Sequence, residues 1–578
     1  MTTSTTAEGH SDKRSWPRWA SRHRAGVPPQ ADQPTGRDRG ADLVGWLAIV
    51  SVLLWPVVEA IRIIVQPVHE VVFGDFALFE LATRDAWHLE QLLGPSASPG
   101  FHHLGPAMFY LLAPAVRLLE PGPGLYLGAV LINAVALAAV AVLIWRRAGS
   151  RAALWTAIAL NLFCLAVSLD TLRQPWNPLL IITPMLLFVV LWAAAVTRTA
   201  GAWLWAAVVG SYEIQTHVTA AVFVAAMLSL AAVWSLVRMW RGAPPWQPRR
   251  WWRHWGRLSG FAALALMWVP STLELFRGDP NNLSLILRWW QAGEGSRTAL
   301  DSASSIVLRS LAISPPHRTT PILGSLSWWS APLPASWTKE VAALLVLIAS
   351  ALLVGWLVRR RRGFAAALAC APLLAVPLAV VTVHRAGDAD YAYVTGWLAF
   401  VPYVALVALG VGLLAPRPSA ATRPPPPNTR SRPARPSLNA TALLTVMAMA
   451  AAGVTVATDL RGRSLASVNE ETARATTFVA DAKAQLRPHD SWIGYSVASP
   501  DAWEVTAAVV LELERLGYHS VVDARQVKLF GQDRTTQRPY SVLFAFYETG
   551  DPMGAGGALG SPISAAGDTV MTVWRPPG

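Results

Sequence analysis

Long apolar runs, separated by short polar stretches, dominate the chain from residue 43 onward. A helix needs about 20 predominantly apolar residues to cross the hydrocarbon core of a bilayer. Runs of this kind lie at 43–65, 125–145, 152–170, 179–196, 216–237, 258–276, 340–358, 364–383, 393–414 and 438–457. A shorter run at 201–213 is expected to cross as well, paired tightly with the next run. The pattern predicts an all-α polytopic membrane bundle of about 11 transmembrane helices.

Arginine clusters in the polar stretches predict how this bundle is oriented. They lie in the amino-terminal tail, at 146–151, at 238–257, at 359–362 and at 417–435. Because short loops rich in Arg and Lys stay in the cytoplasm, the amino terminus is expected inside and the carboxyl terminus outside the plasma membrane. The apolar segment 105–118 would break this arrangement if it crossed, and it is short for a span. We expect it to lie half inserted in the outer interface.

The same arrangement predicts the domain organisation. Residues 1–42 form a disordered cytoplasmic tail, 43–414 the transmembrane domain, 415–437 a Pro- and Arg-rich cytoplasmic linker and 438–457 the last span. External segments are 66–124, 277–339 and 459–578. In the last of these, helices are expected at 466–486 and 501–517 and strands at 491–497, 519–522 and 540–547, with a Gly-rich loop at 551–568. This alternation predicts a small extracytoplasmic α/β domain.

Composition excludes several classes of protein. Hydrophobic residues make up 53% of the chain and charged residues only 14%, against about 25% charged residues in soluble domains. The net charge of +13 does not indicate nucleic-acid binding, because the arginines lie in the loops that the membrane arrangement explains. Both cysteines, Cys164 and Cys370, lie inside apolar runs, so no disulfide framework is expected. The first span follows a long basic tail and is expected to be an uncleaved anchor.

The first external segment carries the most informative residues. Gly74 and Asp75 precede an apolar-periodic stretch, which predicts a helix with Asp75 at its N-cap and an end near Leu93. Glu80 and Arg84 lie one turn apart on this helix and can form an ion pair. A capped interfacial helix explains these residues structurally. Alternatively, Asp75 is a carboxylate held at the outer face of the membrane to accept a proton or bind a metal.

Other polar residues are expected at the same outer level. Arg173 runs against the charge bias of external loops, so it is expected to bind either a phosphate or a structural partner such as Asp170. Paired histidines before a Gly-Pro break are candidates for contact with a lipid phosphate. The candidate ligands of a phosphate are His102, His103, Arg173 and Arg385, and the candidate substrate-binding residues are Arg84, Trp176, Asn177, Gln215, His217 and Tyr391.

These motifs resemble the GT-C superfamily of membrane glycosyltransferases, in particular bacterial relatives of protein O-mannosyltransferases and aminoarabinose transferases. The resemblance covers roughly residues 43–400 and is carried by Gly74-Asp75 with Glu80, by His102-His103-Leu104-Gly105-Pro106, and by Arg173-Gln174-Pro175-Trp176-Asn177-Pro178. Many relatives have His-Pro-Gly-Pro or Lys-Pro-Pro where this chain has His103-Leu104-Gly105-Pro106. The bias toward arginine and alanine is typical of a GC-rich actinobacterial genome.

The resemblance implies an inverting transfer of a sugar from a polyprenyl-phosphate donor to an external acceptor, which would be an envelope glycan, a lipid or a protein. Asp75 would act as the base, and Glu80 would orient Arg84 or share a divalent cation such as Mg²⁺ or Mn²⁺ with Asp75. Two other functions stay open. A flippase for lipid-linked glycans would need ionisable residues in mid-membrane, which the spans lack. A non-catalytic assembly partner would tolerate substitution of Asp75 and Glu80.

Overall fold

A computed structural model describes most of the chain. The described residues are 39–65, 71–97, 99–119, 123–197, 201–241, 252–292, 297–312, 329–386, 390–416, 438–461, 470–499, 502–531, 533–535, 538–549, 561–566 and 568–576. Nearly all of the predicted tail 1–42 and linker 415–437 lies outside these residues, as does most of the predicted Gly-rich loop.

Ten helical segments in the described part of the chain are long and apolar enough to cross a membrane. They are built from α1 (Arg39–Val65), α4 (Gly124–Ala148), α5 (Ser150–Val167), α7 (Asn177–Leu180) with α8 (Ile182–Val196), η1 (Val218–Ala220) with α10 (Ala221–Trp240), α11 (Trp252–Arg277), α15 (Trp337–Arg359), α16 (Gly363–Ala386), α17 (Ala392–Thr395) with η2 (Gly396–Phe400) and α18 (Val401–Leu414), and α19 (Leu438–Arg461). The predicted eleventh crossing at 201–213 is not among them: it forms the shorter α9 (Ala202–Thr216), a helix of 15 residues that packs against α8, α10 and α11. The predicted helical membrane bundle is confirmed.

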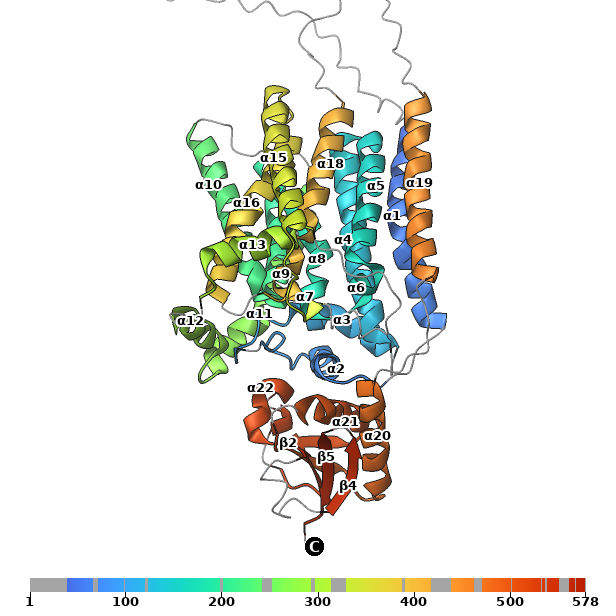
Figure 1. Cartoon of the computed structure of the whole chain (residues 1–578), viewed down its shortest axis with the longest axis vertical. Helices are drawn as coiled ribbons and strands as arrows, with labels where there is room; N and C mark the ends of the chain where they lie inside the picture. Colours follow the sequence, from blue (N-terminus) through green and yellow to red (C-terminus); the bar gives the residue numbers. More distant parts are fainter. Residues whose placement is uncertain are drawn as a thin grey trace, which may run out of the picture.

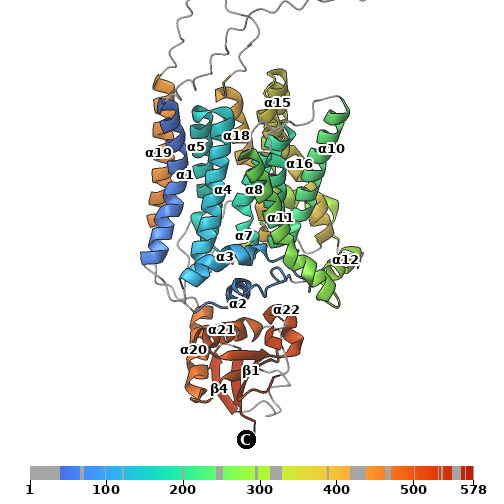
Figure 2. The same cartoon turned by 180° about the vertical axis from the view of Figure 1, so that it is seen from behind.

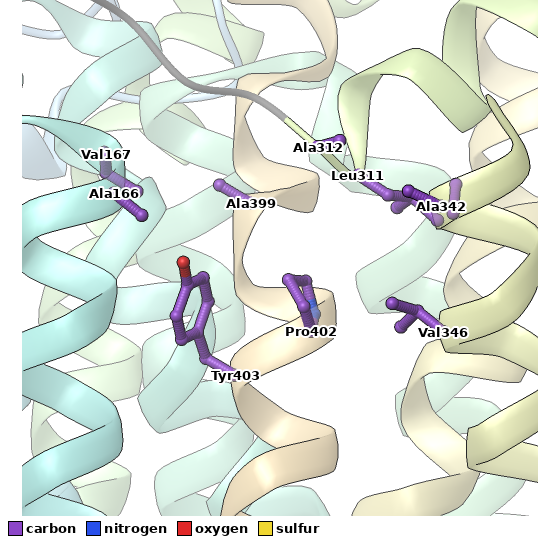
Figure 3. A pocket seen from close by; sticks show the side chains of 10 residues that line it. Ala166, Val167, Leu311, Ala312, Ala342, Val346, Ala399, Pro402 and Tyr403 are labelled. Carbon is purple, nitrogen blue, oxygen red and sulfur yellow. The ribbon is translucent and has the colours of Figure 1, made fainter. Parts of the chain in front are cut away.

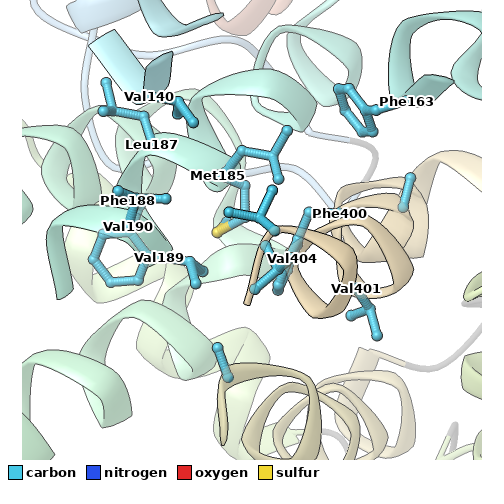
Figure 4. Packing of buried hydrophobic residues seen from close by; sticks show 14 of the residues in the cluster. Val140, Phe163, Met185, Leu187, Phe188, Val189, Val190, Phe400, Val401 and Val404 are labelled. Atoms are coloured by element: carbon cyan, nitrogen blue, oxygen red, sulfur yellow. The ribbon is translucent and has the colours of Figure 1, made fainter. Parts of the chain in front are cut away.

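The core of the bundle lies around α8. In its span 83% of the apolar stretch is buried, against 11% in α11, so α8 is central and α11 faces the surroundings. Figure 4 shows side chains of α8 interleaving with those of α4, α5 and α18, among them Val140, Phe163, Met185 and Val404. Since lipid is as apolar as these side chains, close packing rather than exclusion of water holds such helices together.

The arginine-rich turns gather at one end of the bundle. The guanidinium group of Arg151, where α5 begins, donates to the hydroxyl of Thr441 near the start of α19, 2.8 Å away. Arg362, before α16, donates to the carbonyl of Pro416 after α18, also at 2.8 Å. The C-terminal domain lies at the opposite end (Figures 1 and 2). This separation of basic turns from the C-terminal domain is the one that the charge pattern predicts.

Two short helices of the segment 66–124, which the charge pattern predicts to be external, cross the end of the bundle next to the C-terminal domain. They are α2 (Asp75–Trp87) and α3 (Ala107–Leu118), and α3 lies between α2 and the long helices (Figure 1). With 12 residues, α3 is about 18 Å long and too short to span. The remaining helices on the membrane side are α6 (Leu169–Arg173), α12 (Asn282–Ala292) and α13 (Leu300–Ser310).

The C-terminal domain is a five-stranded sheet with helices on it, in the strand order β2-β1-β3-β5-β4. Its elements are α20 (Glu470–Gln485), β1 (Trp492–Val497), α21 (Trp503–Arg515), β2 (His519–Val522), η4 (Ala524–Gln526), α22 (Val527–Phe530), η5 (Asp533–Thr535), β3 (Val542–Glu548), β4 (Ser561–Ala566) and β5 (Thr569–Trp574). Strands β2, β1 and β3 run parallel, whereas β5 is antiparallel to both β3 and β4. The predicted α/β class is confirmed, but 561–566 forms strand β4 and not part of a loop.

Candidate active site

The site begins at the start of α2, where the structure corrects two expectations. The residue before the helix is Gly74 and not Asp75, and Gly74 has a φ of +57°, a left-handed conformation that glycine adopts at low cost. Asp75 is therefore the first helical residue, so its side chain is not used as a cap. The helix ends at Trp87 and not near Leu93, because the N–H groups of 88–90 turn back to the carbonyls of Asp85 and Ala86.

Asp75 faces a residue of the predicted motif at 173–178. The indole N–H of Trp176, just before α7, donates to the Oδ2 atom of Asp75 across 3.0 Å. Burial raises the pKa of Asp75 above the ordinary value of 3.8, and the hydrogen bond from Trp176 partly opposes this rise. A carboxylate with a raised pKa is a better proton acceptor, and such groups are candidates for general-base catalysis.

A chain of aromatic rings leads away from this contact. Trp176 packs on Tyr393 with ring centres 5.2 Å apart, and Tyr393 lies edge-on to His217 at 6.2 Å. His217 in turn packs on His103 at 4.7 Å. The rings come from the start of α7, from α17, from the end of α9 and from the loop before α3. The structure thus brings three of the predicted residues into one row, which starts at Asp75.

His103 is held in one tautomer by the backbone. The N–H of Val218 donates to its Nδ1 atom at 3.1 Å, so Nδ1 carries no proton and a neutral ring carries its proton on Nε2. Burial, then the charges of His217 and His102, lower the pKa of His103 well below 6.5. His103 can therefore act on a phosphate only as a neutral hydrogen-bond donor.

His102 lies beside His103 but points elsewhere. Its Nδ1 atom is 2.9 Å from the carbonyl oxygen of Gly94, which can only accept, so the ring donates this bond. Burial is the main cause that lowers its pKa, with Lys528 adding to the effect. Asn282, the first residue of α12, binds the backbone of the same loop, because its amide group accepts from the His102 N–H at 2.7 Å and donates to the His102 carbonyl at 2.8 Å. These contacts fix the loop that carries both histidines.

The two arginines proposed as phosphate ligands lie in different surroundings. Arg173 forms the expected pair with Asp170 and lies 4.0 Å from carboxylate oxygens of Glu59 in α1 and Asp459 in α19. These carboxylates balance the charge of Arg173 at the end of α6, so the argument that Arg173 needs a phosphate loses its main support. Arg385, at the end of α16, lies over the ring of Trp290 at 5.6 Å. No described contact joins either arginine to Asp75.

Glu80 and Arg84 form the predicted pair, at 3.0 Å between Arg84 Nη2 and Glu80 Oε1. Both carboxylate oxygens of Glu80 also accept from Arg515 of the C-terminal domain. Glu80 lies five residues after Asp75, about 140° around the helix from it. Since Glu80 is bonded to two guanidinium groups, Asp75 and Glu80 do not make a ligand set that fits a divalent cation. No group of three or more potential metal ligands occurs among the described residues.

The remaining predicted residues surround the row of rings. Asn177 donates to the carbonyl of Thr216 at 3.1 Å, which ties α7 to the end of α9. Gln215 donates to the carbonyl of Met267 in α11 at 3.1 Å, while its side-chain oxygen is buried with no partner among the described residues. Tyr391 stacks on Tyr393 with ring centres 5.8 Å apart. Each of these contacts helps to position the row.

Sequence reasoning missed two residues near this row. Tyr393 lies two positions after Tyr391 and touches both Trp176 and His217; an aromatic pair spaced by two residues was its only signal. Lys528 of α22 brings its amino group within 3.1 Å of the place that a Cβ on Gly100 would take. Nothing in the local sequence connects Lys528 to the first external segment.

An apolar cavity of about 280 Å³ lies in the bundle on the same side as the site. Figure 3 shows side chains from α5, α15 and α18 facing it. It is lined by Ala166, Val167, Leu311, Ala312, Ala342, Ala343, Val346, Ala399, Pro402 and Tyr403. The segment that presents Tyr393 to the row of rings continues, six residues later, into the lining of this cavity at Ala399.

No known family model and no curated protein matches the chain. Among solved structures, it is similar to ArnT from Cupriavidus metallidurans in the apo state, with 13% identity, a TM-score of 0.38, and coverage of 93% of this chain and 98% of that chain. The structure of the same ArnT bound to undecaprenyl phosphate gives 14% identity, a TM-score of 0.33, and coverage of 92% and 98%. At this level of likeness, the site has to be understood from the residues of this chain.

Proposed function

We propose that this protein is a membrane glycosyltransferase that moves a sugar from a polyprenyl-phosphate donor to an acceptor outside the cytoplasm. The observation that carries the proposal is the hydrogen bond between Asp75 and Trp176. It joins two of the three motifs on which the resemblance to GT-C enzymes rests, although 101 residues separate Asp75 from Trp176. A partly buried carboxylate at the end of a membrane bundle suits a reaction between a lipid-linked donor and a water-borne acceptor.

The proposed reaction is a single displacement with inversion. Asp75 takes the proton of the acceptor hydroxyl, and the acceptor oxygen forms a bond to the anomeric carbon of the sugar. The bond from that carbon to the phosphate oxygen breaks, and the polyprenyl phosphate leaves with the electron pair. Partial burial strengthens the basicity of Asp75, and Trp176 holds the carboxylate in one orientation.

The departing phosphate needs groups that stabilise its negative charge. In this proposal His103 donates from Nε2, Lys528 supplies positive charge beside the loop that carries His102, and Arg385 is assigned as a further source of positive charge. Arg173 is left out, since three carboxylates surround it. No step uses a metal ion, because Glu80 is bonded to arginines and does not face Asp75.

The apolar cavity suits the other end of the donor. A chain of isoprene units is apolar and branched, and the cavity is lined by alanine, valine, leucine and proline with one tyrosine. Because such a chain enters from lipid and not from water, close packing against these side chains is what would favour its binding. We place the first isoprene units of the donor there, with the phosphate toward the row of rings.

Lipid and glycan analysis of cells tests the proposal. In a strain that carries only the Asp75→Asn protein, one polyprenyl-phosphate sugar is expected to accumulate, and the same sugar is expected to disappear from one envelope glycan, lipid or protein. Mass spectrometry of both fractions identifies donor and acceptor together. The purified protein, reconstituted in vesicles with that donor, should then transfer the sugar. A normal lipid and glycan profile in the variant strain would favour an assembly partner instead.

A further inference from the structure

Helix α2 belongs to two hydrophobic cores at once. On one side Phe76 and Phe79 pack in a cluster with α3, α4 and the end of α9. On the other side Ala77, Leu78 and Leu81 belong to the same buried cluster as the core of the C-terminal domain. All five side chains are at most 5% exposed. The helix that begins with Asp75 therefore lies between the membrane bundle and the C-terminal domain, as Figures 1 and 2 show.

The C-terminal domain also contacts α2 at its beginning. The N–H of Gly74 donates to the carbonyl oxygen of Glu504 in α21, across 3.1 Å. Gly74 immediately precedes Asp75, so this bond holds the backbone in place at the point where α2 begins. It is a contact between main chains, and it depends on how the two helices lie relative to each other.

A buried ion pair joins the middle of α2 to the end of α21. Arg515 donates from Nε to Oε1 of Glu80 at 2.9 Å, and it makes a second bond to Oε2. The side chains of Arg515 and Glu80 are 7% and 2% exposed. A bidentate pair of this kind fixes orientation as well as distance.

A second buried arginine joins the last turn of α2 to α21. Arg534 bonds both oxygens of Asp85, at 2.6 and 2.9 Å, and both oxygens of Glu514, at 2.8 and 2.9 Å. Burial alone would disfavour its charge, but the carboxylates of Glu514 and Asp85 outweigh burial and raise the pKa of Arg534. Removing one partner of such a group leaves a buried charge without compensation. The contact is therefore strong only when α2 and α21 keep the relative position in which Arg534 reaches both carboxylates.

We propose that the C-terminal domain is a working part of the candidate active site, in which Arg515 and Arg534 are positioning residues that hold α2, and with it Asp75, in place against Trp176. This inference rests on the proposed function, because it gives Asp75 the role of the base. The contacts at residues 74, 80 and 85 attach α2 to the C-terminal domain from its start to its last turn. A displacement of about 1 Å at a reacting group can cost about 10²-fold in rate.

The test compares two variants that each remove one carboxylate from an arginine of the C-terminal domain. Asp85→Asn weakens the bond between α2 and Arg534. Asp490→Asn is the matched control, because Asp490 is a 4% exposed carboxylate bonded to Arg575 at 2.9 Å, with no contact to α2 among the described residues. Two properties are measured on the full-length protein in vesicles: hydrogen exchange of the amides of 75–87, and the steady-state transfer of sugar from the donor lipid.

Positioning predicts a specific pattern. In Asp85→Asn the α2 amides should exchange at least about tenfold faster, and kcat should fall about 10- to 100-fold, while the KM for the donor stays within about twofold because α2 is not expected to bind the lipid. The acid limb of the pH profile should move to lower pH, because exposure of Asp75 to water lowers its pKa by more than loss of the Trp176 bond raises it. The titratable groups near Asp75 on other elements are Tyr393 and Glu504, whose side chain lies beside Gly74. Asp490→Asn should leave α2 exchange, kcat and the pH profile unchanged.

Arg534→Lys serves as a second variant if Asp85→Asn accumulates poorly. Lysine keeps the positive charge but cannot bond two carboxylates bidentately, so a smaller change in the same direction is expected. Fast exchange of α2 with unchanged kcat would overturn the proposal, as would equal losses of kcat in Asp85→Asn and Asp490→Asn. If the wild-type protein transfers no sugar, the proposed reaction is refuted. If α2 then exchanges faster only in Asp85→Asn, the inference that the C-terminal domain holds α2 in place is still supported.

Discussion

Trp176 donates its indole N–H to the Oδ2 atom of Asp75 at 3.0 Å, and this bond connects the first external segment to the segment between α6 and α7. A tryptophan at a membrane interface is usually explained as an anchor in the head groups. Here its polar atom is directed at a carboxylate and its ring packs on Tyr393. The contact gives Asp75 a fixed orientation, from which several measurable consequences follow.

Replacing Asp75 by asparagine should silence transfer without unfolding the protein. Asparagine accepts the same hydrogen bond from Trp176 and is tolerated at a helix start, so insertion and accumulation should stay normal. It cannot accept a proton at neutral pH. Transfer in vesicles supplied with donor lipid is expected to fall at least about 100-fold. Near-normal transfer would remove Asp75 as the base and favour an assembly partner.

Replacing Trp176 by phenylalanine should shift the pH dependence of transfer. A base must be deprotonated, so activity falls as pH drops through the pKa of Asp75, which burial raises above 3.8. The hydrogen bond from Trp176 lowers this pKa, so its loss raises the pKa further and moves the acid limb of kcat/KM to higher pH. The pH profile of kcat/KM, measured with the donor below saturation, checks the direction. A shift to lower pH would contradict the assigned contact.

Local patterns in the sequence were sufficient for the membrane-side framework. The apolar runs predicted the spans, and the spacing of four residues predicted the pair of Glu80 and Arg84. Local patterns failed where the backbone conformation of a neighbouring residue decides where a helix begins or ends. Asp75 was expected at the N-cap because aspartate caps helices well, but the left-handed φ of Gly74 moves the turn back by one residue. Similarly, the end of α2 was predicted too late in the chain, because the turn at 88–90 that ends the helix contains no glycine or proline to indicate it.

Long-range contacts could not be predicted from spacing. Arg515 and Arg534 reach Glu80 and Asp85 across 435 and 449 residues. In the sequence, Arg515 is an ordinary charge at the end of a helix and Arg534 an ordinary charge in a polar stretch. The partner of Arg173 in α6 was foreseen as Asp170, one turn away, whereas Glu59 and Asp459 come from the first and last spans. Only the packing of the helices brings these carboxylates together.

The paired histidines should not titrate near neutral pH. Burial lowers the pKa of both His102 and His103, and the Val218 N–H already uses the Nδ1 atom of His103. The rate of transfer is therefore expected to be flat between about pH 6 and 8, where an ordinary histidine would change charge. His103→Asn keeps an acceptor for Val218 but loses the Nε2 donor, and should lower kcat about tenfold. A step in the rate near pH 6.5 that disappears in His103→Asn would show that the ring is charged in the working enzyme.

The orientation of the bundle can be checked with single cysteines. Arg360, in the turn between α15 and α16, and Arg525, in the C-terminal domain, are exposed. The arginine-rich turns and the C-terminal domain lie at opposite ends of the molecule (Figure 1). With Cys164 and Cys370 replaced, an impermeant thiol reagent on intact cells should label Arg525→Cys and not Arg360→Cys. Permeabilised cells serve as the control, in which both should react. The reverse labelling would place Asp75 on the cytoplasmic side and overturn the proposed donor and acceptor.

Filling the apolar cavity should weaken donor binding while sparing the chemistry. Ala342 of α15 lines the cavity and is itself exposed, so a phenylalanine there can enter the space without forcing a buried neighbour aside. If isoprene units occupy this space, Ala342→Phe should raise the KM for the donor about tenfold, equal to about 1.4 kcal/mol of lost binding, with little change in kcat. Leu352→Phe, on an exposed part of the same helix, adds the same ring away from the cavity and should change neither constant. A shortened donor with one or two isoprene units keeps the units that we place in the cavity, so Ala342→Phe should raise its KM by a similar factor. Unchanged KM values for both donors in Ala342→Phe would show that the lipid runs along another surface of the bundle.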